Sequence, residues 1–414
     1  MATTDSNTGV PDLGGEVPKV DLDSGTPSGS GVSHGEIVPR VGDGLQFVDA
    51  GGTAPEDRAF RPDIEGLRGV SVLLVVLFHS GNFHLVGGYV GVDVFFVISG
   101  FVITGILLRQ SASTGRPKML AFYGRRVLRI VPMATVVIAV TMVAERVLIG
   151  VSAAQNAASG ARWATLFCAN IHSSLLFGTF WSLGVEEQFY LVYPALLFAV
   201  AIVCRKWPIR AKLAVVLAIV IVASFSWSAL NPAAEYGSAI GRAWELAVGA
   251  MLAVATGYLK KLPASIAAVM TWTGLIGLTV IAFGLNFSSA YPGPLSALPV
   301  GAAALIIGGG TAAPRMGVES LLKLAPFKWT GRWSYSLYLW HWPIIIIALQ
   351  HWRYTDTLTN LLPVGLAVAL SAGTYFAIEN PIRHSTFLRR SPVISIAFGG
   401  VLVAVCLVVI ASVS

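Results

Sequence analysis

An arginine and a histidine, Arg68 and His79, stand eleven positions apart in a run that is otherwise almost entirely apolar. On an α-helix this spacing places both side chains on one face, about 16 Å apart along the axis. An arginine near the centre of a bilayer costs about 2.5–3.5 kcal/mol on insertion scales, so an ionisable residue inside a membrane span indicates a functional site. The pair therefore predicts a site that handles a polar or charged ligand within the membrane.

A carboxylate, Asp93, lies close to His79 in the chain, near the start of the next apolar segment. Counted along their helices, the two side chains lie at similar depths below the same end, about 8 Å for Asp93. We expect Asp93 to face His79, to orient its ring and to stabilise its protonated form, as a carboxylate does for a catalytic imidazole. A histidine held in this way can act as a general base toward a hydroxyl group.

Two more carboxylates, Glu186 and Glu187, open a later apolar segment, one to two turns below its end. Adjacent residues point in different directions on a helix, so we expect at most one of them to share a cavity with His79. We assign Glu187 to catalysis together with His79 and Asp93, and Glu186 to substrate binding.

Four further polar residues stand inside apolar segments, and each has a structural and a functional interpretation. Arg242 and Glu245 are three residues apart on one helix and can form either a structural ion pair or part of a substrate site. Tyr338 shares a helical stripe with His341, and it can bond between helices or touch substrate. His341 can likewise be a satisfied buried imidazole or a substrate ligand.

A basic cluster, Arg125, Arg126 and Arg129, precedes another apolar run. Membrane topology alone explains such a cluster, because cytoplasmic loops are rich in Lys and Arg. Arginine rather than lysine also suits bidentate phosphate recognition. The chain shows no phosphate-binding loop and no Gly-x-Ser-x-Gly elbow, which weighs against an ATPase or a hydrolase. The three cysteines lack metal or redox spacing, so we expect no metal site and no disulfide framework.

The elements that carry these residues are expected to be membrane helices. The chain is 55% hydrophobic and 12% charged, with a mean hydropathy of +0.72, so we predict an all-α polytopic membrane protein. Eleven segments are long and apolar enough to cross a bilayer of about 30 Å. They lie near 67–86, 88–108, 128–149, 181–203, 212–230, 238–258, 264–284, 296–312, 333–350, 361–380 and 392–412.

The basic residues indicate how these segments are oriented. If odd-numbered segments run outward, 24 of the 28 Lys and Arg residues fall on the inner side. We therefore expect a cytoplasmic N-terminus and an extracytoplasmic C-terminus. The half-polar stretch 150–180 is left out of the spans, as a re-entrant or surface helix.

The same pattern divides the chain into three parts. Residues 1–60 are rich in Gly, Pro, Ser, Asp and Thr and are predicted to form a disordered cytoplasmic tail. Residues 61–385 hold the ten core spans, and 386–414 add one C-terminal span. No inverted repeat is visible, which argues against a repeat-built transporter.

Several ordered motifs carry a resemblance to a known family. Segment 61–109, with Arg68, His79 and Asp93, resembles the opening of the acyltransferase type 3 family of membrane-bound O-acyltransferases. The likeness continues in order over about residues 60–385. It includes the basic cluster, Phe-Trp-Ser-Leu-Gly-Val-Glu-Glu-Gln-Phe-Tyr, Arg-Ala-Trp-Glu-Leu, Tyr-Ser-Leu-Tyr-Leu-Trp-His-Trp-Pro and Ile-Glu-Asn-Pro-Ile-Arg.

The resemblance implies roles for matched residues. Arg68 and His79 match the family's Arg/Lys-x10-His motif, with His79 catalytic, and Arg126 and Arg129 match its Arg-x-x-Arg motif. It implies a cytoplasmic acyl-CoA donor, usually acetyl-CoA, which we expect to dock against Arg68, Arg126 and Arg129. The implied acceptor is a hydroxyl group on an envelope polysaccharide, a glycolipid or a glycosylated metabolite at the bacterial plasma membrane.

Many relatives with these motifs carry an extracytoplasmic SGNH-type domain after an eleventh span, whereas this sequence stops at Ser414. The domain is naturally absent, works from a separate chain as a partner, or is missing from a truncated sequence. His79 then activates an acceptor hydroxyl or takes the acyl group itself. Other interpretations are an acyl relay for a separate transferase and a transporter or flippase of an envelope precursor, which also places ionisable residues along a midplane path.

Overall fold

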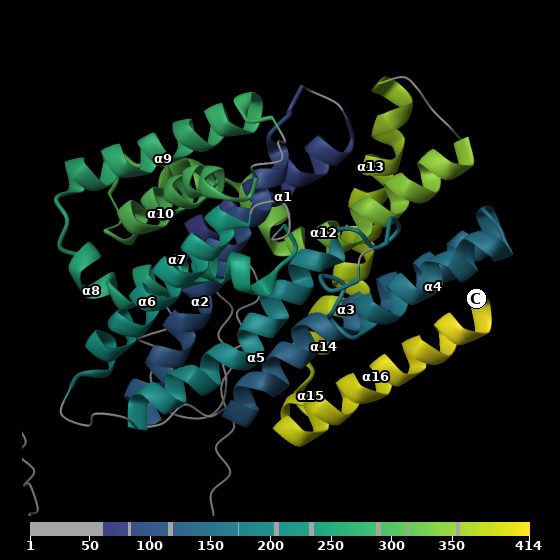
Figure 1. Ribbon diagram of the computed structural model, residues 1–414, viewed down its shortest axis with the longest axis horizontal. Helices are drawn as coiled ribbons and strands as arrows, with labels where there is room; N and C mark the ends of the chain where they lie inside the picture. The colour runs from purple at the N-terminus through teal and green to yellow at the C-terminus, as the bar shows by residue number, and fades with distance from the viewer. Residues whose placement is uncertain are drawn as a thin grey trace, which may run out of the picture. The chain divides into compact units, whose positions relative to one another are not determined.

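The computed structural model describes residues 61–81, 84–114, 119–172, 174–202, 207–231, 236–286, 291–312, 314–352 and 357–414. Within these ranges every regular element is helical (Figure 1), so the predicted all-α class is confirmed. The tail predicted at 1–60 lies outside the described residues.

Each of the eleven predicted spans falls on a long helix. These helices are α1 (Pro62–His79), α2 (Gly91–Thr114), α3 (Met119–Leu148), α5 (Phe180–Ile202), α6 (Ile209–Leu230), α7 (Ala239–Val254), α9 (Ala264–Gly284), α10 (Ala297–Thr311), α12 (Ala325–Trp352), α13 (Thr357–Thr374) and α16 (Pro392–Val413). The other elements between them are η1 (Gly88–Val90), α4 (Val151–Thr165), α8 (Thr256–Leu259), η2 (Pro294–Ser296), α11 (Glu319–Leu322), η3 (Tyr375–Glu379), α14 (Asn380–His384) and α15 (Thr386–Arg389).

Eight helical segments of the described chain are long and apolar enough to cross a membrane, which confirms a multi-pass membrane protein. The helices α1, α7 and α12 fall outside this set. Charged residues near its start lower the apolarity of α1, α7 has only 16 residues, and α12 carries a polar stripe of Ser, Tyr and His. The exact number of eleven spans therefore stays a prediction.

Helices α1 and α12 run parallel to each other along their length. Near one end Arg68 of α1 bonds to Ser334 of α12, and near the other His79 bonds to His341. Parallel packing agrees with the predicted topology, in which both segments cross in the same direction. Both ends of α1 thus contact one polar stripe on α12, which runs from Ser334 to His341.

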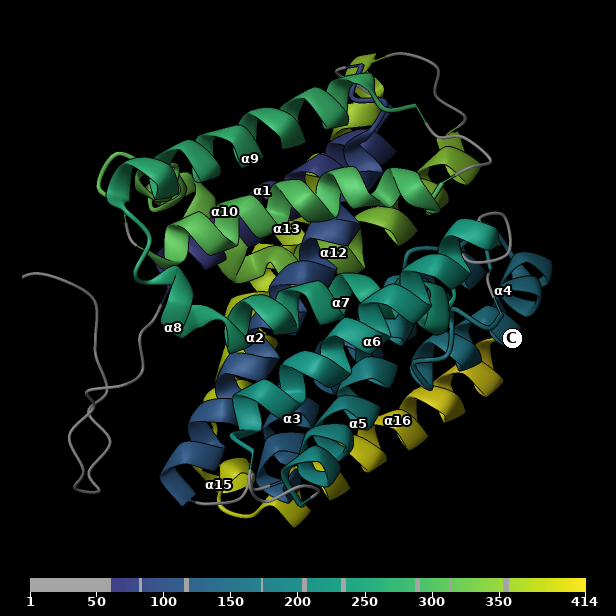
Figure 2. The same ribbon diagram turned by 60° about the vertical axis from the view of Figure 1, so that its left-hand side comes forward.

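Helices α3 and α16 are also parallel, and they lie side by side in Figure 1 and Figure 2. A Cβ atom added at Gly124 would lie 3.1 Å from Cα of Pro392, near the start of both helices. Near their ends, Arg146 Nη1 donates to the carbonyl of Val413 at 2.8 Å. The last helix thus packs along the helix that carries the basic cluster.

Helices α3 and α5 run in opposite directions although α4 stands between them in the chain. Tyr123 of α3 donates to the carbonyl of Leu191, and Arg126 one turn later reaches back to Glu187. If α4 crossed the membrane completely, α3 and α5 would run the same way. The antiparallel pairing agrees with leaving 150–180 out of the spans.

Close approach of α2 and α7 depends on two glycines. A Cβ atom at Gly100 would lie 1.8 Å from the carbonyl oxygen of Leu246, and one at Gly249 would lie 1.9 Å from that of Val97. Small residues let membrane helices approach at backbone distance, where van der Waals contact and polar bonds hold them. This crossing determines which way the polar face of α2 points.

Candidate active site

A cavity with about 800 Å³ of empty space lies between α1, α2, α3, α5 and α12. Eight of its nineteen lining side chains are Val, Ile, Leu or Phe. The polar lining residues are Arg68, Ser99, Arg126, Arg129, Ser182, Glu186, Glu187, Tyr190, Ser334, Tyr335 and Tyr338.

Three arginines contribute positive charge to this cavity. Arg129 has no hydrogen-bond or ion-pair partner among the described residues, and Arg68 donates only to the neutral hydroxyl of Ser334, at 2.9 Å. Arg126 is 3.2 Å from Glu187 and stacks on the ring of Tyr190 at 3.7 Å, while its Nε atom is buried with no partner. The three guanidinium groups predicted to bind the acyl donor therefore line one cavity, and they keep N–H groups that are not hydrogen-bonded to the described residues.

Both predicted glutamates line the same cavity. Glu186 accepts hydrogen bonds from Ser99, at 2.5 Å, and from the hydroxyl of Tyr190. Glu187 accepts from Arg126, and Glu186 is 3.9 Å from the same Arg126 nitrogen. Arg126 thus lies within reach of both acids, and because His79 does not line this cavity, the expectation that at most one of them shares a cavity with His79 stays a prediction.

The histidine His79 bonds to a second histidine. Its Nδ1 atom is 3.0 Å from Nε2 of His341, with the ring centroids 5.2 Å apart and the ring planes inclined by 22°. The indole of Trp342 covers His79 at 4.5 Å between centroids. His341 is fully buried, with its Nδ1 atom 2.7 Å from the carbonyl oxygen of Tyr338.

The predicted contact between His79 and Asp93 is wrong. Asp93 bonds instead to Arg242, at 2.8 Å, and to the hydroxyl of Tyr291, at 2.5 Å. The physical reason is the packing: α1 lies along α12, whereas α2 turns its polar face toward α7. Counting residues along each helix does not show on which side of α2 the partner of Asp93 lies.

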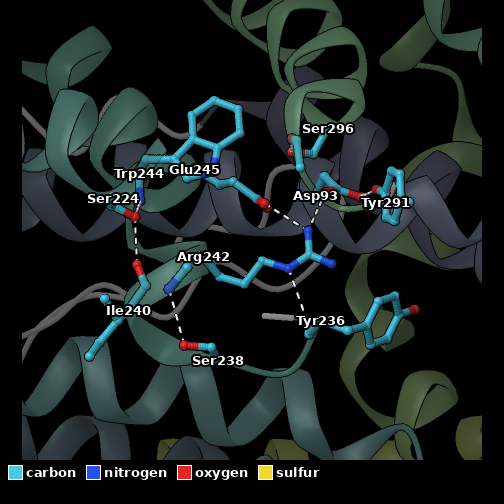
Figure 3. A network of polar contacts seen from close by, with 12 residues as sticks. Asp93, Ser224, Tyr236, Ser238, Ile240, Arg242, Trp244, Glu245, Tyr291 and Ser296 are labelled. Atoms are coloured by element: carbon cyan, nitrogen blue, oxygen red, sulfur yellow. Dashed lines mark hydrogen bonds and ion pairs between the residues drawn. The ribbon is translucent and has the colours of Figure 1, made fainter. Parts of the chain in front are cut away.

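Arg242 is the centre of this second polar cluster (Figure 3). Its Nη1 atom donates to Asp93 and, at 2.7 Å, to Glu245, and its Nε atom donates to the carbonyl of Tyr236 at 3.1 Å. The predicted pairing of Arg242 with Glu245 is thus confirmed. Asp93, Arg242 and Glu245 are at most 1% exposed, and none of them lines the cavity.

Tyr338 contacts both the cavity and the histidine pair. Its hydroxyl bonds to Ser182 Oγ at 2.6 Å and to the carbonyl of Thr179 at 2.9 Å, and its ring lies 5.5 Å from that of His341. His79 and His341 do not line the cavity, so Tyr338 lies between the cavity and the histidine pair. The sequence signal for this arrangement was the stripe shared by Tyr338 and His341, but it did not show that the stripe faces α1.

Comparisons with known proteins give a consistent picture. Residues 61–412 match the family model Acyl_transf_3, described as an acyltransferase domain. No solved structure matches the chain.

Three relatives illustrate the similarity. The chain is 28% identical over 365 residues to a peptidoglycan O-acetyltransferase of Listeria monocytogenes, covering 81% of this chain and 58% of that protein. It is 28% identical over 356 residues to a Bacillus subtilis protein provisionally named a peptidoglycan O-acetyltransferase, with coverages of 79% and 55%. It is 32% identical over 314 residues to a Komagataeibacter xylinus protein provisionally named a membrane-bound transacylase, with coverages of 71% and 75%. The chain thus spans little more than half the length of the first two.

Proposed function

The chain belongs to the acyltransferase type 3 family, and from this premise we propose that it is an integral-membrane O-acyltransferase. It moves an acyl group, acetyl in the first instance, from acyl-CoA to a hydroxyl group of a lipid-linked or extracytoplasmic glycan. The names of the relatives support this acceptor class, because two are named for the O-acetylation of peptidoglycan. The observation that carries the proposal is the cavity of three arginines at one end of the stripe that α1 and α12 share, with His79 at the other.

The cavity arginines suit the phosphate groups of coenzyme A. Guanidinium groups bind phosphate through two parallel charge-assisted hydrogen bonds, which a lysine cannot reproduce. Among the described residues no carboxylate is bound to Arg129 or Arg68, so both offer their charge without breaking an ion pair there. Arg126 lines the same cavity, and its contact with Glu187 keeps the side chain in place.

The orientation of the molecule follows from the same residues. The Arg68 end of α1 faces the cytoplasm, where 24 of the 28 Lys and Arg residues fall, and where acyl-CoA is made. The His79 end of α1 then lies toward the outer leaflet of the plasma membrane, nearer the acceptor. The acyl group travels from the cavity past Tyr338, the lining residue whose ring contacts His341.

His79 carries the chemistry. In direct transfer, its unprotonated nitrogen takes the proton of the acceptor hydroxyl, a C–O bond forms, the thioester C–S bond breaks, and the proton passes to the departing CoA thiolate. In the stepwise route, the same nitrogen attacks the thioester, and the C–S bond breaks to release the CoA thiolate; the hydroxyl group then attacks the acyl-histidine, the C–N bond breaks, and the hydroxyl proton balances the thiolate as the free thiol. Both routes require one imidazole nitrogen of His79 with a free lone pair.

The proposal is tested with the full chain in detergent micelles, radiolabelled acetyl-CoA and soluble peptidoglycan fragments. We expect alkali-labile label on the glycan and an equal amount of free CoA. The His79→Ala variant should give neither, whereas His351→Ala, at an exposed position of α12, should match the unsubstituted protein. Movement of glycan across a vesicle membrane without CoA release would support a transporter instead. Release of CoA with label held on the protein would support an acyl relay.

A further inference from the structure

The pairing of His79 with a second histidine, rather than with a carboxylate, determines where the protons lie. We propose that His341 is a positioning residue, which holds His79 in the tautomer that has its free lone pair on Nε2. This inference rests on the proposed function, because it assigns a role to His341 in the same reaction.

The proton on His341 is located by its backbone contacts. Its Nδ1 atom lies 2.7 Å from the carbonyl oxygen of Tyr338 and 3.2 Å from that of Leu337. A carbonyl oxygen accepts hydrogen bonds and never donates them, so Nδ1 of His341 must carry the hydrogen. Both carbonyls belong to the preceding turn of α12, and the helix itself therefore sets the tautomer.

The other nitrogen of His341 is an acceptor. The side chain is fully buried, and none of the described carboxylates forms an ion pair with it. A charged imidazole without a partner in such a place would pay a large desolvation penalty, so His341 is neutral and its Nε2 atom holds a lone pair.

The proton on His79 follows from this acceptor. Its Nδ1 atom is 3.0 Å from Nε2 of His341, a distance at which one nitrogen donates and the other accepts. Since Nε2 of His341 accepts, Nδ1 of His79 carries the hydrogen and Nε2 of His79 is left with the lone pair. Two carbonyls on α12 thus control, through two rings, which nitrogen on α1 can react.

The neutral Nε2 atom of His341, as a hydrogen-bond acceptor, has a clear function in this reaction. When Nε2 of His79 takes the proton of the acceptor hydroxyl, the ring becomes cationic, and its bond from Nδ1 to His341 becomes charge-assisted and stronger. The interaction therefore grows as the reaction proceeds, which is the property that speeds a chemical step. The ring of Trp342 covers the same imidazole and limits its rotation.

Substitutions at position 341 separate positioning from packing. His341→Phe keeps a flat ring but removes the acceptor. His341→Gln places an amide oxygen where the Nε2 atom of histidine lies, so it can still accept from His79. We expect His341→Phe to lower kcat about 100-fold with little change in KM for acetyl-CoA, and His341→Gln to recover about tenfold of that loss.

The controls make the outcome decisive. His351→Phe introduces the same change at an exposed position of α12 and should leave kcat unchanged. Thermal unfolding in the same detergent shows whether each variant is folded. If His341→Phe does not fold, His341→Asn takes its place, because its shorter amide does not reach Nδ1 of His79 and should be as slow as we expect for Phe.

Three results have distinct meanings. Equal kcat for folded His341→Gln and His341→Phe, or His341→Asn in its place, would overturn the inference and leave His341 as a packing residue. Full activity in His341→Phe, together with an inactive His79→Ala, would overturn the inference while the proposed function stands. The proposed function itself is overturned if two results come together. The unsubstituted protein would transfer no acetyl group to peptidoglycan fragments, and His79→Ala would remain fully active toward another acceptor.

Discussion

Two groups of charged residues lie within the helices of this protein, and they are built on opposite principles. In the α2–α7 cluster, formed by Asp93, Arg242 and Glu245, one guanidinium group bonds to two carboxylates and a backbone carbonyl. The cavity arginines are Arg68, Arg126 and Arg129. Among the described residues only one carboxylate, Glu187, lies within hydrogen-bond distance of any of them, and all three line the cavity. Charge alone does not identify a membrane site, whereas charge with unused bonding capacity beside a cavity does.

The comparison assigns the α2–α7 cluster to structure. Its side chains are at most 1% exposed, and three aromatic rings lie 5.3–5.5 Å from the guanidinium carbon of Arg242. Breaking one partner of a buried ion pair leaves a bare charge, which costs about 3–5 kcal/mol. Of the two roles that the sequence left open for Arg242 and Glu245, we therefore propose the structural one, in which they hold α7 against α2.

The largest expected effect is the loss of Arg242. Arg242→Met leaves two carboxylates buried without a cation, and we expect the free energy of unfolding to fall by about 3–5 kcal/mol. Denaturant unfolding in mixed micelles measures it. Arg162→Met changes an exposed arginine and should fall within about 0.5 kcal/mol of the parent. Equal stability of the two variants would remove the structural role of the cluster.

The α2–α7 crossing gives the next effect. Gly100→Ala adds a Cβ atom 1.8 Å from a backbone oxygen of α7, so the helices must separate, at a cost of about 1–3 kcal/mol. Gly400→Ala, on an open face of α16 with nothing within 4 Å, is the matched control. Unchanged thermal unfolding of Gly100→Ala would show that this crossing does not depend on close approach.

The opposite behaviour is expected of the cavity arginines. Arg129→Ala breaks no bond to the described protein, so its thermal unfolding should stay close to that of the parent. We expect its acetyl-CoA concentration for half-maximal rate to rise about 10–100-fold, which corresponds to about 1.4–2.8 kcal/mol. Arg125→Ala removes an exposed charge four positions earlier in the same basic cluster. If both variants show the same donor dependence, the cluster serves topology alone.

The smallest expected effect concerns the hydroxyl that holds Arg68. Ser334→Ala removes a bond of 2.9 Å, and we expect the free energy of unfolding to fall by about 0.5–1.5 kcal/mol. The acetyl-CoA requirement should rise less than in Arg129→Ala, because the charge of Arg68 remains. A rise larger than that of Arg129→Ala would make Ser334 itself a ligand of the donor.

The sequence was informative where local spacing determines the answer. It predicted the helical class and the segments that became helices. It also predicted the pairing of Arg242 with Glu245, because residues three apart on a helix are neighbours whatever the fold. It also singled out Arg68 and His79, which the structure places along one helix packed on α12.

The partner of His79 could not be predicted in the same way. His341 is 262 positions away in the chain, and only the packing of α1 on α12 brings the two rings together. Depth in the membrane made Asp93 the natural candidate, but depth does not say which neighbour a helix face meets. The cavity itself depends on five helices that are distant in sequence, and no local pattern reveals it.

The central claim is that the cavity arginines bind the acyl donor and His79 performs the transfer. The most direct test measures, for His79→Ala in detergent micelles, both the binding of acetyl-CoA by calorimetry and the transfer of acetyl groups to peptidoglycan fragments. We predict that His79→Ala binds acetyl-CoA as tightly as the unsubstituted protein and transfers no acetyl groups. Acetyl transfer at the parent rate by folded His79→Ala would contradict the claim.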